Sequence, residues 1–132
     1  MPAILKPRRG SAVLEREAKR AELRARERFE KGIAKRRDGG CRWPIKHVCR
    51  GGLEAAHVLD ASLGGEMIAS NLIILCAWIH RRGPESIHGK QLKVEPETIA
   101  GADGCCSFYQ LDENGMWICV GVESAIGVLL KN

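Results

Sequence analysis

The sequence predicts an α+β fold with a charged N-terminal helix, a central segment of short strands followed by an apolar run, and a C-terminal β-hairpin. Residues 12–37 repeat apolar residues at intervals of three and four, which is the period of a helix. Residues 53–59 and 91–95 are short strand-like segments bounded by glycine or proline. Asn114-Gly115, between two further strand-like segments, is a strong hairpin signal. At 132 residues the chain is expected to form one domain.

The N-terminal quarter carries all of the basic excess. Residues 1–38 contain 13 Lys and Arg against 6 Asp and Glu, whereas residues 39–132 contain 8 against 10. This asymmetry predicts a basic tail and charged helix (residues 1–38) that face a polyanion, followed by a near-neutral globular part (residues 39–132). The alternative is a solvated charged helix that has no partner.

The first residues divide into a tail and a helix. Residues 1–10 are expected to be a disordered basic tail, because two prolines and a glycine oppose regular structure there. Ser11 is the expected N-cap of a helix over residues 12–37, and Gly39-Gly40 should end that helix. Its basic side could lie along phosphates, or the helix could dock on a protein partner. An apolar stripe made largely of alanine should anchor it only in part; the stripe consists of Leu14, Ala18, Ala21, Ala25, Phe29 and Ile33.

Export and membrane signals are not visible in the sequence. The longest apolar run, residues 72–79, is far shorter than a bilayer span, and the start of the chain does not look like a signal peptide. We therefore expect a cytoplasmic protein with no membrane partner. In that compartment the six cysteines should be reduced thiols, which favours metal ligation over a disulfide framework.

Residues 54–88 carry the most informative pattern, which reads EAAHVLDASLGG, then SNLIILCAWIH, then RRGPESIH. The order of His57, Asn71 and His80 resembles the motif of the HNH endonuclease family, and the likeness covers about residues 38–96. The stretch that ends at His88 is similar to small HNH proteins common in bacteriophage genomes, which implies an intracellular, phage-type nuclease.

The resemblance implies a ββα-metal core, similar to a treble clef, within residues 41–96, and leaves residues 97–132 as a C-terminal β element. In such a core, residues 53–59 would form the first strand and residues 66–69 the returning strand. The apolar segment that ends at His80 would form the helix.

The resemblance also implies a role for each motif residue. His57 would be the general base that deprotonates the attacking water, because imidazole titrates near neutrality. Asn71 would hold the loop that follows the base, since an amide both donates and accepts hydrogen bonds. His80 would ligate a divalent cation: Mg²⁺, Mn²⁺, Ni²⁺ or Zn²⁺. The structural alternatives are a half-buried histidine, a helix cap and a solvent-facing histidine, respectively.

Ala56 departs from the family pattern, which commonly has Asp or His immediately before the base as a second metal ligand. Glu54 is the expected replacement, because residues two apart on a strand share a face, and Asp60 is a second candidate. Glu54 as a surface carboxylate is the alternative. His88 is an auxiliary candidate ligand that could fold back from the loop.

Two further sets of residues are candidates for binding. Arg81 and Arg82 are expected to contact DNA phosphates through their forked donors, or else to be a solvated helix end. Three cysteines are most of a structural zinc site, with His47 as a substitute for the fourth ligand; they are Cys41, Cys49 and Cys76. The family's usual fourth cysteine would stand at Ile79. The alternative is that these thiols pack as small hydrophobic groups.

The sequence thus predicts a metal-dependent endonuclease that hydrolyses DNA phosphodiester bonds and leaves 5′-phosphates, with a possible structural zinc. One rival is a catalytically degenerate HNH-fold protein that binds nucleic acid or assists phage assembly or packaging with a protein partner. Another is a thiol-rich interaction module that does not bind nucleic acid.

Overall fold

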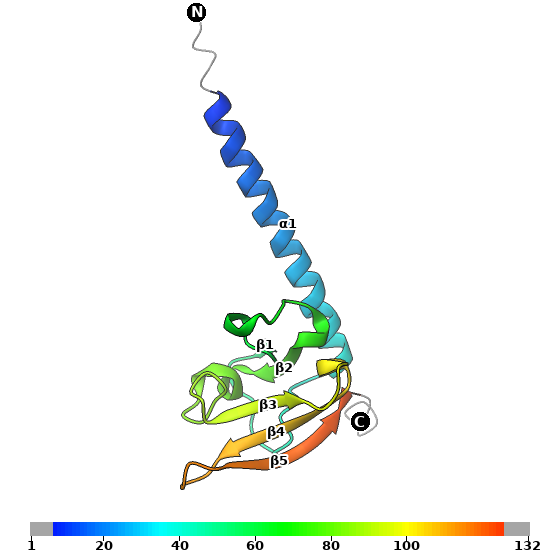
Figure 1. Ribbon diagram of the computed structural model, residues 1–132, viewed down its shortest axis with the longest axis vertical. Helices are drawn as coiled ribbons and strands as arrows, with labels where there is room; N and C mark the ends of the chain where they lie inside the picture. The colour runs from blue at the N-terminus through cyan, green and yellow to red at the C-terminus, as the bar shows by residue number, and fades with distance from the viewer. Residues whose placement is uncertain (1–6, 126–132) are drawn as a thin grey trace, which may run out of the picture.

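The computed structural model describes residues 7–125, which form one long helix and two small antiparallel sheets (Figure 1). This confirms the expected α+β class. Helix α1 spans Pro7–Asp38, so the disorder expected over residues 7–10 and the N-cap expected at Ser11 are wrong. Proline is accepted in the first turn of a helix because its missing N–H would have no partner there anyway. Residues 1–6 of the expected tail lie outside the described residues.

Most of α1 extends away from the rest of the molecule (Figure 1). Its residues from 10 to 26 are exposed, and Leu14 and Phe29 of the expected stripe retain about two thirds of their exposure, at 65% and 64%. Only the last turns pack on the domain, where Ala34 is fully buried against Leu72 and Ile74. The helix is therefore anchored only in part, as expected, but the contact is made by Ala34 and not by the stripe, whose residues Ala18, Ala21 and Ala25 are exposed as well. No helix within residues 7–125 has the length and apolar content needed to cross a membrane.

A two-stranded sheet forms the middle layer. Strand β1 (Leu53–His57) pairs with strand β2 (Leu72–Cys76), and every residue of β2 is buried. Leu72 and Ile74 face α1, whereas Ile73 and Leu75 face the second sheet. The returning strand expected at residues 66–69 is wrong, because the apolar run itself supplies the strand. A strand buried on both faces reads as a continuous hydrophobic run and is easily taken for a helix.

The segment after β2 also differs from the expectation. The long helix expected to end at His80 is a single π-helical turn over Trp78–Arg82, and Cys76 ends the strand rather than beginning a helix. Gly83 closes the turn by donating its N–H to the carbonyl of Trp78 at 2.8 Å.

A three-stranded sheet forms the outer layer, in the order β3-β4-β5: β3 (Leu92–Pro96), β4 (Cys105–Leu111) and β5 (Trp117–Ser124). The expected hairpin is confirmed between β4 and β5. Asp112 Oδ1 accepts the backbone N–H groups of Asn114 and Met116, and Gly115 has φ +77°, which glycine adopts without strain. The core lies between the two sheets, where the rings of Phe108 and Trp43 pack edge to face with their centroids 5.6 Å apart.

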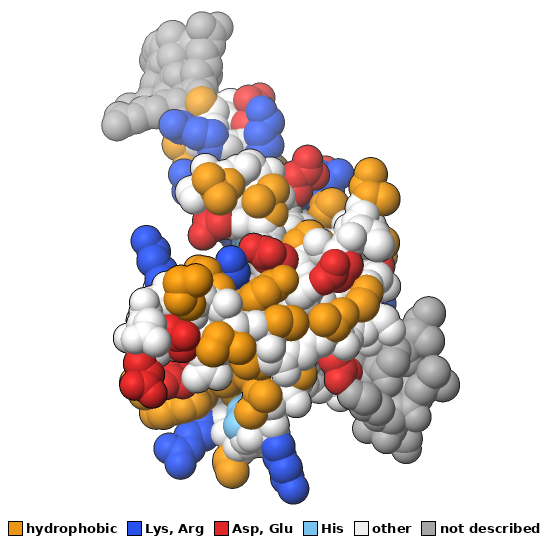
Figure 2. Space-filling model, turned by 60° about the horizontal axis from the view of Figure 1, so that its bottom comes forward, with side chains coloured by type: hydrophobic (Ala, Val, Ile, Leu, Met, Phe, Trp, Pro, Cys, Tyr) orange, Lys and Arg blue, Asp and Glu red, His pale blue; other side chains and the backbone are white. Residues whose placement is uncertain are grey.

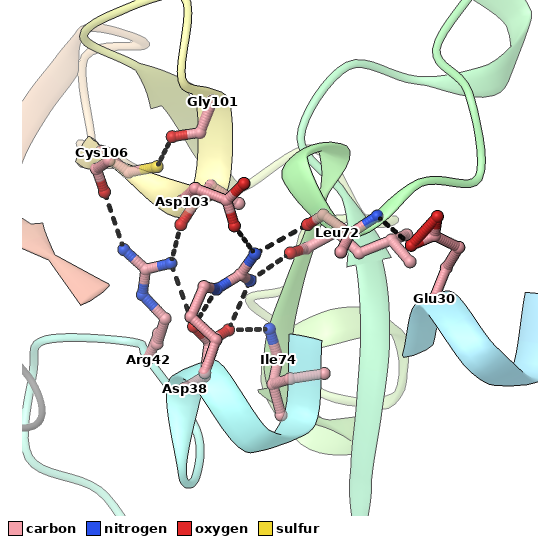
Figure 3. A network of polar contacts seen from close by, with 12 residues as sticks. Glu30, Asp38, Arg42, Leu72, Ile74, Gly101, Asp103 and Cys106 are labelled. Atoms are coloured by element: carbon pink, nitrogen blue, oxygen red, sulfur yellow. Dashed lines mark hydrogen bonds and ion pairs between the residues drawn. The ribbon is translucent and has the colours of Figure 1, made fainter. Parts of the chain in front are cut away.

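A buried polar network fixes the end of α1 to both sheets (Figure 3). Asp38, the last residue of the helix, is fully buried and accepts hydrogen bonds from Arg37, Arg42 and the backbone N–H of Ile74. Arg42 also donates to the carbonyl of Ala102, beyond β3. Removing one partner of such a network leaves a buried charge uncompensated, so the network holds the helix end in one orientation.

Candidate functional site

A cluster of three cysteines and one histidine lies at the start of the globular part. The ligand atoms of Cys41, His47, Cys49 and Cys76 all lie within 4.8 Å of one another. His47 Nε2 lies 3.6 Å from Sγ of Cys41, and 3.5 Å from Sγ of both Cys49 and Cys76. Tetrahedral zinc, with Zn–S near 2.3 Å and Zn–N near 2.0–2.1 Å, requires sulfur and nitrogen about 3.6 Å apart. The cluster can therefore hold a metal ion, and its nitrogen-to-sulfur distances match those of a tetrahedral zinc site.

The groups around this cluster orient its ligands. His47 Nδ1 lies 2.7 Å from the carbonyl of Ile45, which fixes the proton on Nδ1 and leaves the Nε2 lone pair toward the sulfurs. The backbone N–H of Cys76 donates to Sγ of Cys41 at 3.3 Å. Such donors stabilise a thiolate, which is the form that binds metal.

The thiols of the cluster titrate differently. Burial, opposed by backbone hydrogen bonds from Cys76 and Trp43, raises the pKa of Cys41 to about 12. Burial also acts to raise the pKa of Cys76, but the backbone N–H groups of Ile79 and Arg50 together with His47 outweigh it and lower that pKa to about 7. Cys76 is therefore the thiol that deprotonates first, and a divalent cation would draw the other protons off.

The second assembly is a cavity of about 590 Å³ beside the end of β1. It brings together His57, His80 and His88, which lie far apart in the sequence, and Asp60 and Lys90 also line it. His88 reaches the cavity because its backbone N–H donates to the carbonyl of His80 at 3.0 Å. The rings of these two histidines meet edge to face, with centroids 4.5 Å apart.

Asn71 closes the loop that follows His57. Its Oδ1 accepts the N–H of Leu59 at 2.8 Å, and its Nδ2 donates to the carbonyls of Leu59 and Glu66 at 3.0 and 2.9 Å. Its own carbonyl accepts the N–H of Val58 at 2.8 Å. The side chain thus fixes the loop that follows His57 through Leu59 and Glu66.

Glu54 lies behind His80 rather than in the cavity. Its Oε1 is 2.8 Å from Nδ1 of His80, and its carboxylate accepts hydrogen bonds from Nε and Nη2 of Arg81. The Arg81 hydrogen bonds, with burial opposing them and His80 assisting, lower the pKa of Glu54 to about 2. Burial lowers the pKa of His80 despite its bond to Glu54, so its imidazole is neutral near pH 7. This geometry suits an orienting carboxylate, because it holds the proton on Nδ1 and leaves Nε2 able to ligate.

The remaining candidates lie at the edges of the site. Arg81 and Arg82 are both exposed, and Arg81 is ion-paired with Glu54. Ala56 is buried against Ile73 in the core and offers the cavity no ligand atom.

Lys90 lines the same cavity as His57, although nothing in the sequence indicates this position. Its φ is +59°, a strained conformation for a non-glycine residue. Of the other cysteines, Cys106 is buried and Cys119 is exposed, and neither belongs to the cluster.

Comparisons with models of known protein families, with curated proteins and with solved structures give no match for this chain.

Proposed function

We propose that the protein is a metal-dependent endonuclease that hydrolyses phosphodiester bonds in DNA by HNH-type chemistry. The observation that carries the proposal is the meeting of His57, His80 and His88 in one cavity, with Asn71 bonded to the loop after His57. A base, its orienting amide and imidazole ligands for a cation are the parts that this chemistry needs.

The residues in and around the cavity have separate tasks in this mechanism. His57 takes the proton from the water that attacks the phosphorus, the bond between phosphorus and the 3′ oxygen breaks, and that oxygen leaves with a proton from solvent. Asn71 keeps the loop after His57 in place. His80 would hold a divalent cation through Nε2, with Glu54 fixing the ring from behind, and His88 would be the neighbouring second ligand. Asp60 is an additional carboxylate in the lining of the cavity. Hydrogen bonds from the backbone and the side chain of Ser62 lower the pKa of Asp60, so this carboxylate is ionised near neutral pH. When bound, the cation supplies Lewis-acid stabilisation of charge on the phosphate.

The cysteine-histidine cluster has a structural role in this proposal. All four of its donors are protein side chains, and a closed site of this kind is typical of structural rather than catalytic zinc. Its ligands join the loop over residues 41–49 to the end of β2, close to the π-helical turn that carries His80. Zinc here would secure a loop that otherwise has little regular structure.

Incubation with supercoiled plasmid and Mg²⁺, Mn²⁺ or Ni²⁺ tests the proposal. Metal-dependent nicking is expected from the native chain, and His57→Ala should lower its rate by 10²-fold or more, roughly the value of a positioned general base. Cys119→Ser, at an exposed position outside both sites, is the matched control and should cleave normally. Cleavage that survives in His57→Ala would show that this base is wrongly assigned.

The lack of a ligand at Ala56 favours a second candidate, an HNH-fold protein that binds DNA without cutting it. It predicts salt-sensitive retention of duplex DNA and no nicking with any of the three cations. His57→Ala would then leave DNA binding unchanged.

A further inference from the structure

One side of α1 carries a regular series of basic residues. They recur at intervals of three or four, so they form one row along the helix, here called the basic ridge: Arg16, Arg20, Arg24, Arg28, Lys31 and Lys35. Glu17 and Glu27 lie within the same side, which leaves six basic residues against two acidic ones. No side chain of the ridge makes an ion pair within residues 7–125, so its charges are free for an external anion.

The basic ridge leads into the candidate site. Lys31 and Lys35, at its C-terminal end, line a surface hollow of about 380 Å³ together with Glu54, His80 and Arg81. His80 also lines the cavity that contains His57, so the hollow and the cavity share one wall. The row of positive charge is therefore continuous with the groups proposed to perform the chemistry.

The face of the molecule shown in Figure 2 suits a polyanion less well, because hydrophobic and acidic side chains occupy its centre and Lys and Arg lie along the projecting helix and at the margins. Arginine predominates in the ridge, and its forked donors match phosphate oxygens. From Arg16 to Lys35 the ridge is about 28 Å long at ~1.5 Å per residue. That length corresponds to roughly 8 base pairs of duplex at ~3.4 Å each.

We propose that the basic ridge binds the phosphate backbone of duplex DNA and directs one strand across Lys31 and Lys35 to the cavity. The inference rests on the proposed function for its second part, the delivery of a strand to His57 and His80. The duplex-binding surface itself stands without that function. The length of the ridge also assigns the substrate class. The substrate would be duplex DNA with at least about 8 base pairs on one side of the bond that is cut, at ~3.4 Å per base pair.

The test compares two doubly substituted chains with equal loss of charge. Arg20→Gln with Arg24→Gln removes two ridge residues, whereas Lys19→Gln with Arg26→Gln removes two from the other side of the same exposed helix. Glutamine preserves helix propensity, which circular dichroism would verify. Fluorescence anisotropy with a labelled 30-base-pair duplex of mixed sequence, without added divalent cation, measures affinity as salt is varied.

The ridge variant should reduce the slope of log affinity against log salt by about 2 and weaken binding at 0.1 M salt by roughly 50-fold. The control variant should stay within about threefold of the native chain, since its residues face away from the backbone. Equal losses in both variants, or a native chain that does not bind duplex, would overturn the proposal. The proposal would also be overturned if the ridge bound a second copy of the chain. Light scattering would then show that the native chain is a dimer and that only the ridge variant is a monomer.

Plasmid nicking separates this inference from the proposed function. A native chain that binds duplex through the basic ridge but does not nick plasmid supports the ridge and contradicts the nuclease. A native chain that nicks plasmid at a rate unchanged by the ridge substitutions supports the nuclease and contradicts the ridge.

Discussion

Glu54 and His80 form a hydrogen-bonded pair, with Oε1 of the carboxylate 2.8 Å from Nδ1 of the ring, although 25 residues separate them in the chain. Arg81 holds the other side of the same carboxylate, with Nη2 2.7 Å from Oε2. The glutamate is thus engaged on both sides, and the imidazole presents its remaining nitrogen for ligation. The direct ligand expected at Glu54 is, in this arrangement, an orienting group.

Glu54→Gln should weaken cation binding at the cavity by roughly 10–100-fold, the usual effect of losing an orienting carboxylate. The amide keeps the shape but not the charge that holds both His80 and Arg81. Isothermal titration with Mn²⁺ measures the change, and Glu113→Gln in the exposed hairpin turn is the matched control. Equal affinity in Glu54→Gln and the native chain would show that the pair does not support a cation.

Cation affinity should depend on pH through His80. Burial lowers its pKa below the ordinary value of 6.5, so the ring is mostly neutral at pH 7 and takes up its proton in more acidic solution than a free imidazole does. Mn²⁺ affinity should therefore hold from about pH 8 to about pH 7 and fall in more acidic solution, because a protonated imidazole cannot ligate. The unfolded chain binds this proton at higher pH, so stability also decreases as pH falls below 6.5. An affinity that already falls between pH 8 and 7 would contradict this assignment.

Asn71→Asp should destabilise the fold by about 1–3 kcal/mol, because a carboxylate cannot donate to the carbonyls of Leu59 and Glu66. The bond from the N–H of Leu59 would survive. Urea denaturation measures the loss, and plasmid nicking should fall further than stability does, since the loop beside His57 is no longer fixed. Unchanged stability and nicking together would show that this amide has no positioning role.

The cysteine-histidine cluster should bind one zinc ion per chain, measured by elemental analysis of the purified protein. His47→Ala or Cys41→Ser should lose the metal and lower the melting temperature, because each removes one of four ligands. Cys119→Ser should retain it. Full zinc content in His47→Ala would show that the histidine is a neighbour of the cluster rather than a ligand.

The elements with local signals could be predicted from the sequence. Asn114-Gly115 determines its own turn, and the three-to-four spacing over residues 12–37 is a property of one helix. Strand β2 could not be predicted in the same way. An apolar run of this length fits a helix or a doubly buried strand equally well, and only its place between α1 and the outer sheet decides.

The candidate site could be predicted only in part. A shared site for His57, Asn71 and His80 was expected from the resemblance to the HNH motif alone, because nothing in their spacing requires that they meet. The structure places His57 and His80 on one cavity and bonds Asn71 to the loop after His57. His47 was only a substitute ligand, since its separation from Cys76 gives no indication of contact. Lys31 belongs to a helix that looks separate from the site in sequence, and only the packing of α1 on the middle sheet brings it near His80.

Cys76 and His80 belong to one short stretch, with the cluster at its beginning and the cavity at its end. A strong chelator would consequently inactivate the proposed nuclease by two routes that differ in time course and reversibility. Withdrawal of a loosely held ion from His80 should be immediate and fully reversed by Mg²⁺. Withdrawal of zinc should be slow, and Mg²⁺ cannot reverse it because thiolates do not suit that ion. Activity lost to a chelator therefore identifies the responsible ion only when its recovery is followed with each metal separately.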